Sequence, residues 1–171
     1  MKTICIFLAV IFAGLSAFAF DIESEAFIQK GYIPDRYTCD SKDLSPELTW
    51  SDVPSGAKSL ALICDDPDAP FTTWVHWLLI NIPTDYKKLS EGISVQDLKD
   101  AGIVLGKNDF GKLAYGGPCP PKGKPHRYFF KLYALDTTLS LPEGFSKDQV
   151  IKAIQGHIIA ETKIIGLYQR K

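Results

Sequence analysis

The sequence predicts a mainly β protein, folded as a β-sandwich or a barrel-like sheet with a few short peripheral helices. Thirteen glycines and eleven prolines are spread over 171 residues, which is typical of a chain that turns often. Short apolar segments bounded by turn residues outnumber segments with helical periodicity. With 46% hydrophobic residues, the chain can bury one sizeable core but is too short for two ordinary domains.

The first nineteen residues differ from the rest and are typical of a secretory signal peptide. Lys2 supplies the positive start, residues 4–13 the apolar core, and Ala17-Phe18-Ala19 the cleavage site. The apolar stretch is too short to span a bilayer comfortably. We therefore expect residues 1–19 to be removed and residues 20–171 to form one exported domain, periplasmic or secreted, without a membrane span. The alternative is an uncleaved membrane anchor.

Six apolar segments flanked by turn residues are predicted strands. They are Ser24–Gln29, Glu47–Trp50, Ser59–Cys64, Val75–Ile82, Arg127–Leu135 and Ile158–Ile165. Ser94 can cap a helix over Val95–Ala101, because a serine side chain accepts a hydrogen bond from a free amide at a helix start. Ser146 can do the same for Lys147–Gln155. A glycine directly follows each segment and can end the helix.

Two rigid turns carry most of the polar groups that can build a site. Asp66-Pro67-Asp68-Ala69-Pro70 places two carboxylates in a proline-stiffened segment just after a predicted strand. Gly117-Pro118-Cys119-Pro120-Pro121 comes shortly before His126. Proline fixes φ and restricts the residue before it, so these segments hold their side chains in place. An acidic turn and a histidine turn of this kind predict a pocket.

Strand alternation predicts which side chains share a sheet face with His76 and which share one with His126. One face of residues 74–80 holds Trp74, His76, Leu78 and Ile80, and one face of residues 126–134 holds His126, Tyr128, Phe130, Leu132 and Ala134. Each strand then begins with polar or amphipathic groups and continues into the core on the same side, as at a pocket mouth. The alternative is a pair of hydrogen-bonded strand-end histidines without a ligand.

Three cysteines remain once the signal peptide is removed. Cys64 lies in an apolar run and is expected to be a buried thiol, whereas Cys39 and Cys119 lie in turn-like segments. In an oxidising compartment, Cys39 and Cys119 are therefore the expected disulfide pair, with three free thiols as the alternative. The cysteines and histidines lack the C-x-x-C or H-x-x-x-H spacing of a zinc site, and no cofactor is expected.

Four segments resemble the two signature regions of the phosphatidylethanolamine-binding proteins. They are the acidic turn 66–70, Trp74-Val75-His76, the segment 117–121 and His126-Arg127-Tyr128. Further segments resemble the bacterial, Raf-kinase-inhibitor-like branch of this family, and the similarity covers residues 22–168. The resemblance implies an antiparallel β-sandwich and a small anion pocket. It implies that the pocket is lined by Asp66, Asp68, Trp74, His76, Gly117, Pro120, Pro121, His126 and Tyr128.

Carboxylates beside an anion need a special arrangement, because they repel phosphate at neutral pH. An aspartate that accepts a ring N–H from His76 or His126 favours the imidazolium form and directs the other N–H at the anion. Amides around Gly117 would complete the phosphate cradle. Arg127 points to the opposite strand face, so we expect it to form a structural ion pair with Asp66 or Asp109.

Three function classes remain open. The first is a non-catalytic binding module for a small phosphorylated or carboxylated ligand. The second is a metal-assisted hydrolase that uses the Asp/His cluster, although the sequence lacks a G-x-S-x-G motif. The third is an inhibitor that contacts a protein partner through residues 83–125. A homodimer is a further option that the resemblance implies. The net charge of −1 and the lack of a basic run argue against nucleic acid.

Overall fold

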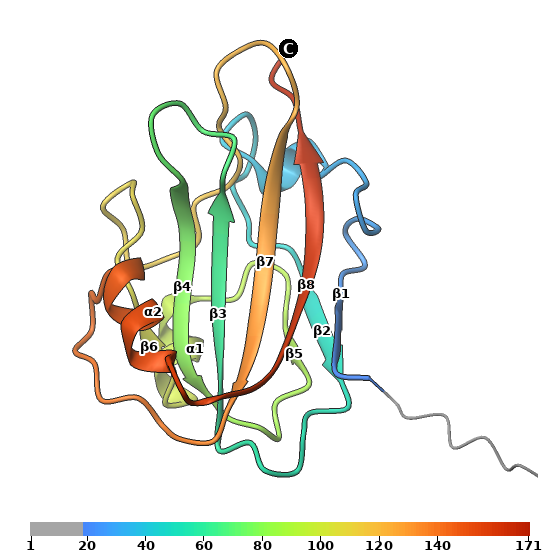
Figure 1. Cartoon of the computed structure of the whole chain (residues 1–171). Helices are drawn as coiled ribbons and strands as arrows, with labels where there is room; N and C mark the ends of the chain where they lie inside the picture. The colour runs from blue at the N-terminus through green and yellow to red at the C-terminus, as the bar shows by residue number, and fades with distance from the viewer. Residues whose placement is uncertain (1–18) are drawn as a thin grey trace, which may run out of the picture.

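The computed structural model describes residues 19–171, and it contains two antiparallel sheets packed face to face (Figure 1). The larger sheet has the order β6-β4-β3-β7-β8 and the smaller one β1-β2-β5. The strands are β1 (Asp21–Glu23), β2 (Leu48–Ser51), β3 (Ser59–Asp66), β4 (Trp74–Ile82), β5 (Lys88–Leu89), β6 (Val104–Leu105), β7 (His126–Leu135) and β8 (Ile158–Tyr168). The helices are α1 (Val95–Asp100), α2 (Lys147–Ile154) and the 3-10 turn η1 (Asp35–Tyr37). The predicted mainly β sandwich is confirmed.

Two apolar layers hold these elements together. Between the sheets, Leu62 and Phe130 of the large sheet and Leu48 and Trp50 of the small one belong to one buried cluster. On the other face of β3 and β4, a second cluster includes side chains from the strands and from α2, among them Val150. Burial on both faces explains why β3 is a continuous apolar run. The central strands therefore form a firm base for whatever side chains lie at their ends.

Both predicted helices are present and each ends one residue before its predicted end. The Ser94 hydroxyl accepts the Asp97 amide, and Ser146 forms a reciprocal capping box with Gln149. The glycine that follows each predicted helix has a left-handed φ, which glycine adopts without steric cost. Five of the six predicted strands are found, with shifted ends.

The predicted strand Ser24–Gln29 is wrong. The strand in this region, β1, ends at Glu23. The Ser24 hydroxyl donates to the Glu47 carbonyl and accepts the Ala26 amide, so the chain turns away from the sheet here. Serine side chains favour such local turns over a strand ladder, which explains the early end.

The predicted signal peptide lies outside the described residues, except for Ala19. Within residues 19–171, no helix has the length and apolar character needed to cross a bilayer.

The cysteine predictions are confirmed. Cys39 and Cys119 form a disulfide with a Cα–Cα distance of 5.4 Å, and Cys64 is a buried free thiol in β3. The bond joins the segment after η1 to the segment before β7, across 80 residues of chain. A backbone hydrogen bond from the Cys39 amide to the Pro118 carbonyl, 3.1 Å long, runs beside it.

This disulfide closes a long loop, so its removal should raise the conformational entropy of the unfolded chain and thereby destabilise the fold. The double variant Cys39→Ala/Cys119→Ala should lower the free energy of unfolding by about 2–5 kcal/mol, measured by denaturant unfolding without reductant. The wild type measured with reductant is the control and should match the variant. Equal stability of variant and oxidised wild type would contradict the bond in solution.

Candidate functional site

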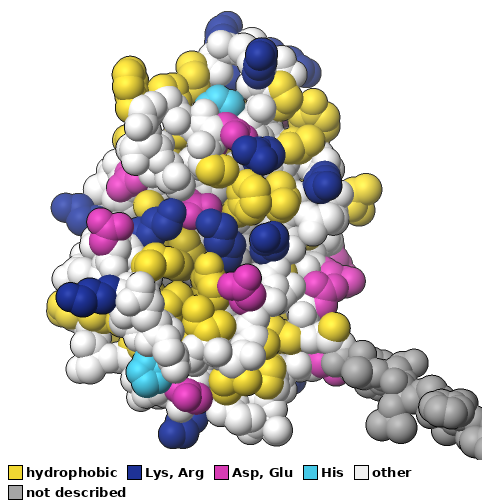
Figure 2. Space-filling model, in the orientation of Figure 1, with side chains coloured by type: hydrophobic (Ala, Val, Ile, Leu, Met, Phe, Trp, Pro, Cys, Tyr) yellow, Lys and Arg dark blue, Asp and Glu magenta, His cyan; other side chains and the backbone are white. Residues whose placement is uncertain are grey.

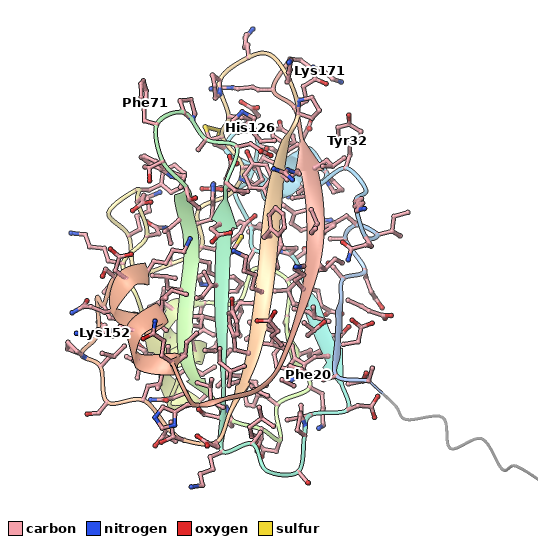
Figure 3. All side chains as sticks on the ribbon, in the orientation of Figure 1. Phe20, Tyr32, Phe71, His126, Lys152 and Lys171 are labelled. Carbon is pink, nitrogen blue, oxygen red and sulfur yellow. A yellow bond between two sulfur atoms is a disulfide. The ribbon has the colours of Figure 1, made fainter. Side chains whose placement is uncertain are left out.

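A pocket of about 290 Å³ opens at the end of the large sheet, where β3 ends and β4 and β7 begin. Figure 3 shows Phe71 and His126 at this end of the molecule. The lining residues are Asp66, Ala69, Pro70, Phe71, Trp74, His76, Phe110, Cys119, Pro121 and His126. The acidic turn and the histidine turn of the sequence therefore meet in space.

Asp66 and His126 form the buried polar pair of this pocket. The Asp66 carboxylate accepts the Asp68 amide with one oxygen and His126 Nδ1 with the other, each at 2.8 Å. An ionised carboxylate only accepts hydrogen bonds, so Nδ1 carries a proton and Nε2 remains free for a ligand. The bond places the His126 ring at the end of the central strand β3. This matches the predicted pairing of a carboxylate with His126.

Asp68, the second aspartate of the turn, binds Arg127, the residue of β7 that follows His126. The Asp68 carboxylate accepts Arg127 Nε and Nη2, each at 2.7 Å, as a bidentate pair. The predicted ion pair of Arg127 is therefore present, but the predicted partners Asp66 and Asp109 are wrong. Hydrogen bonds from Arg127 lower the pKa of Asp68. Asp68 thus braces the turn from outside and does not line the pocket.

His76 reaches the pocket because β4 contains a bulge. Trp77 lies opposite Cys64 and Val75 lies opposite Asp65, so His76 is an extra residue between two paired positions. An extra residue reverses the alternation of side chains beyond it. The prediction that His76 shares a face with Leu78 and Ile80 is therefore wrong. Leu78 and Ile80 pack in the cluster under α2, whereas His76 turns toward the pocket.

The His76 ring is held in one orientation and kept neutral. Its Nδ1 lies 2.6 Å from the Gly116 carbonyl, which only accepts, so Nδ1 carries the proton. Its ring packs edge-on against Phe110 and Tyr128. Burial lowers the pKa of His76. His76 therefore offers a hydrogen-bond acceptor at Nε2, in contrast to the imidazolium form expected from the sequence.

Of the remaining predicted site residues, Trp74 and Pro121 line the pocket, and Gly117, Pro120 and Tyr128 do not. The Gly117 amide donates to Asp43 at 2.7 Å, and a Cβ at Gly117 would lie 2.2 Å from the Tyr37 carbonyl oxygen. Gly117 therefore allows close packing on η1, and its amide is not available to cradle a phosphate. Pro120 and Tyr128 are buried but do not line the pocket. Whether the nine predicted residues bind a ligand stays a prediction.

Sequence reasoning missed Phe71 and Phe110 as pocket residues. Asn108 positions Phe110: its side-chain oxygen accepts the Phe110 amide at 3.1 Å and its side-chain nitrogen donates to the His76 carbonyl at 3.2 Å. The Asn108-Asp109-Phe110-Gly111 turn was the available signal, because asparagine before a glycine turn often bonds the local backbone. No comparable signal marks Phe71, whose side chain projects from an exposed loop.

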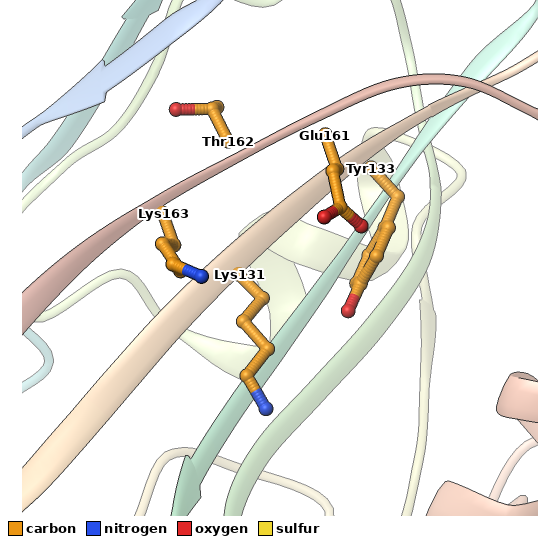
Figure 4. A pocket seen from close by; sticks show the side chains of 5 residues that line it. All are labelled: Lys131, Tyr133, Glu161, Thr162 and Lys163. Atoms are coloured by element: carbon orange, nitrogen blue, oxygen red, sulfur yellow. The ribbon is translucent and has the colours of Figure 1, made fainter.

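A second hollow, of about 330 Å³, lies on the outer face of β7 and β8. It is lined by Lys131, Tyr133, Glu161, Thr162 and Lys163 (Figure 4). Lys131 already forms an ion pair with buried Asp65, with Nζ 2.8 Å from the carboxylate. The hollow contains neither a histidine nor a buried acid–base pair, so the chemistry favours the pocket at the sheet end. Within residues 19–171, no group of three or more His, Cys, Asp or Glu is placed to hold a metal.

The sequence profile of the phosphatidylethanolamine-binding protein family matches residues 23–169. The UPF0098 protein of Methanothermobacter thermautotrophicus is 53% identical over 88% of this chain and 99% of its own length. The UPF0098 protein of Aquifex aeolicus is 48% identical over 88% of each chain. Among solved structures, Escherichia coli YbcL, a member of the mammalian PEBP family, has a TM-score of 0.83 at 36% identity, covering 89% of this chain and 99% of YbcL.

The neutral state of His76 makes a prediction about acid stability. Unfolded His76 takes up a proton near pH 6.5 but folded His76 resists it, so its contribution to stability is complete above about pH 6.5 and is lost as the pH falls below that value. In His76→Asn, the amide nitrogen can still donate to Gly116. The free-energy difference between wild type and this variant should shrink as the pH falls from about 7.5 to about 5.

Urea unfolding at each pH measures this difference. The control is His157→Asn, at an exposed histidine. Its free energy of unfolding should fall with pH as that of the wild type does, because His76 is still present. A difference between wild type and His76→Asn that is the same at both pH values would show that His76 is not held neutral.

Proposed function

The chain belongs to the phosphatidylethanolamine-binding protein family, and we propose that it is a non-catalytic binding module for a small ligand that carries a phosphate or carboxylate group. The observation that carries this proposal is the buried Asp66–His126 pair that lines the pocket. In the imidazolium form of such a ring, Nδ1–H is held by the carboxylate and the free Nε2–H is a charged donor for an oxyanion.

The charges in the pocket favour a ligand that also donates a hydrogen bond. The charge of a protonated His126 ring would be offset by the adjacent Asp66 carboxylate, and His76 adds only an acceptor, because burial lowers its pKa. A dianion would therefore meet little net positive charge. A monoprotonated phosphate, or a zwitterion such as phosphoethanolamine, offers both an oxyanion for His126 and a donor for His76. The apolar walls, Trp74 and Phe110 among them, exclude water and strengthen these bonds.

The Cys39–Cys119 disulfide supports export, because such bonds persist in oxidising compartments. We propose that the protein acts in the periplasm or outside the cell.

A metal-assisted hydrolase is the weaker candidate. Both histidine rings already use Nδ1, one with Gly116 and one with Asp66, and their neighbours within residues 19–171 supply no third ligand at metal-binding distance. Metal analysis of the purified protein separates the two functions, since the binding module needs no stoichiometric metal.

Calorimetric titration with phosphoethanolamine tests the binding proposal. His126→Ala should lower the affinity by about 1.5–3 kcal/mol, the size of a hydrogen bond to a charged group. Asp66→Asn should also weaken binding, although it removes a negative charge, because the ring loses its carboxylate.

The chain offers a matched control for these variants. His157 also pairs with an aspartate, Asp136, at 2.8 Å, but at the other end of β7 and exposed to solvent. His157→Ala should leave the affinity unchanged. A His126→Ala variant that binds as the wild type does, or an Asp66→Asn variant that binds more tightly, would overturn the mechanism.

A further inference from the structure

The Cys39–Cys119 disulfide forms part of the pocket wall. Cys119 and Pro121 line the pocket, and Cys119 is bonded to Cys39 in the segment that follows η1. Figure 3 shows sulfur atoms, in yellow, at the end of the molecule that carries His126. The disulfide therefore joins the ligand site directly to a second segment of the chain.

The wall segment 118–121 has few other links to the residues after η1. Three of its four residues are prolines, which have no N–H to donate. A hydrogen bond from the Cys39 amide to the Pro118 carbonyl, 3.1 Å long, joins the two segments beside the disulfide. Within residues 19–171, opening the disulfide would leave this one backbone hydrogen bond between the wall segment and residues 38–44.

A thiol in solution can reach this disulfide. Cys39 is exposed and Cys119 is half-buried in the pocket wall, whereas the free thiol of Cys64 is buried. Exposed disulfides are easier to reduce than buried structural ones, and regulatory disulfides are drawn from the exposed class. The position of this bond therefore fits a bond that opens and closes in the folded protein.

Arg170 is placed to stabilise one of the two sulfur atoms when the bond opens. Its Nη1 lies 4.0 Å from Cys119 Sγ, and its Nε donates to Asp40 at 2.9 Å. The Tyr168 hydroxyl donates to the other Asp40 oxygen at 2.8 Å. A guanidinium next to sulfur favours the thiolate, so Cys119 is the better leaving group. Exposed Cys39 is then the sulfur that a reductant attacks.

Positive charge at this end of the molecule favours the approach of a thiolate. Lys122 and Lys124 follow the wall segment and are exposed, and within residues 19–171 neither forms an ion pair. Figure 2 shows Lys and Arg side chains, in dark blue, gathered at this end. Such a field attracts an anionic reactant and raises its rate of encounter.

We propose that the Cys39–Cys119 disulfide is a redox switch of the pocket, opened by a dithiol reductant. A thiolate of the reductant attacks Cys39 Sγ, the S–S bond breaks, and its electron pair moves to Cys119 Sγ beside Arg170. The second thiolate of the reductant then displaces Cys39 from the mixed disulfide. The protein disulfide gains two electrons, the dithiol becomes a disulfide, and the protons that the dithiol lost can return to the two cysteines.

Reduction changes the pocket because it releases the wall. Cys119 and Pro121 then lose their covalent link to the segment after η1, and the pocket is no longer held in the shape that fits its ligand. The affinity for a ligand that carries a phosphate or carboxylate falls. This last step rests on the proposed function, whereas the release of the wall does not.

Glutathione, a monothiol, tests the chemistry because it can trap the first step. After a short incubation and alkylation of free thiols, peptide mapping should find glutathione on Cys39 and the alkyl group on Cys119. Arg170→Gln should slow this step at least about threefold, and Arg170→Lys should keep most of the rate. The control is Arg36→Gln, whose arginine pairs with Glu91, and it should react as the wild type does. Glutathione on Cys119, or no effect of Arg170→Gln, would overturn the assignment of the two sulfurs.

Hydrogen exchange tests the release of the wall without any ligand. After reduction with dithiothreitol, the amides of Cys39 and Gly117 should exchange at least about tenfold faster, while those of β3 keep their protection. The variant Cys39→Ala/Cys119→Ala should show the same fast exchange at residues 39 and 117 without reductant. Unchanged exchange at these two positions, or loss of protection throughout β3, would overturn the switch, since the first leaves the wall fixed and the second is global unfolding.

Titration with phosphoethanolamine tests the effect on binding. The oxidised protein should bind at least about fivefold more tightly than the reduced protein, and saturating phosphoethanolamine should make the disulfide harder to reduce by the same factor. Equal affinity of the two forms would overturn the switch. Oxidised protein that does not bind phosphoethanolamine would contradict the proposed function, and the exchange measurement would then decide the switch.

Discussion

The hydrogen bond between Asp66 and His126 holds together the end of the sheet where the pocket opens. Asp66 ends the central strand β3, and His126 begins the neighbouring strand β7. Both carboxylate oxygens are used, one by the Asp68 amide and one by the ring. If either partner were removed, a buried polar group would be left without its bond, which costs more than the bond itself contributes. The adjacent Asp68–Arg127 pair repeats the link on the outer face, so consecutive residues of β7 are each fixed by one aspartate of the same turn.

Two histidines that face one pocket have different partners. His126 Nδ1 donates to the Asp66 carboxylate, whereas His76 Nδ1 donates to the Gly116 carbonyl, and burial lowers the pKa of His76. Both rings line the pocket, and within residues 19–171 neither Nε2 has a hydrogen-bond partner. A site of this kind selects by the arrangement of hydrogen bonds, because a ligand that leaves either group unpaired loses affinity.

Features that depend on a few neighbouring residues could be predicted from the sequence. Features that depend on contacts between residues far apart in the chain could not. The serine caps of α1 and α2 and the apolar run of β3 are local signals. The residues beside each cysteine were also enough to predict which two form the disulfide and which one is buried. The bulge at His76 depends on how β4 pairs with β3, so strict alternation placed Leu78 on the wrong face. The Gly117 amide was assigned to a ligand because its partner, Asp43, is far away in the chain. Arg127 was correctly given an ion pair but its partner depended on the turn geometry.

The order in which the cysteines are synthesised matters to this protein. Cys39 and Cys64 exist together before Cys119 has been made, and they are much closer in the chain than the native pair, which is 80 residues apart. Loop closure alone would then favour a bond between the wrong two thiols. The finished fold removes that competitor, because Cys64 is buried in β3, between β4 and β7. Burial of Cys64 leaves Cys39 and Cys119 as the pair that can bond, and Cys119 lies in the wall of the pocket.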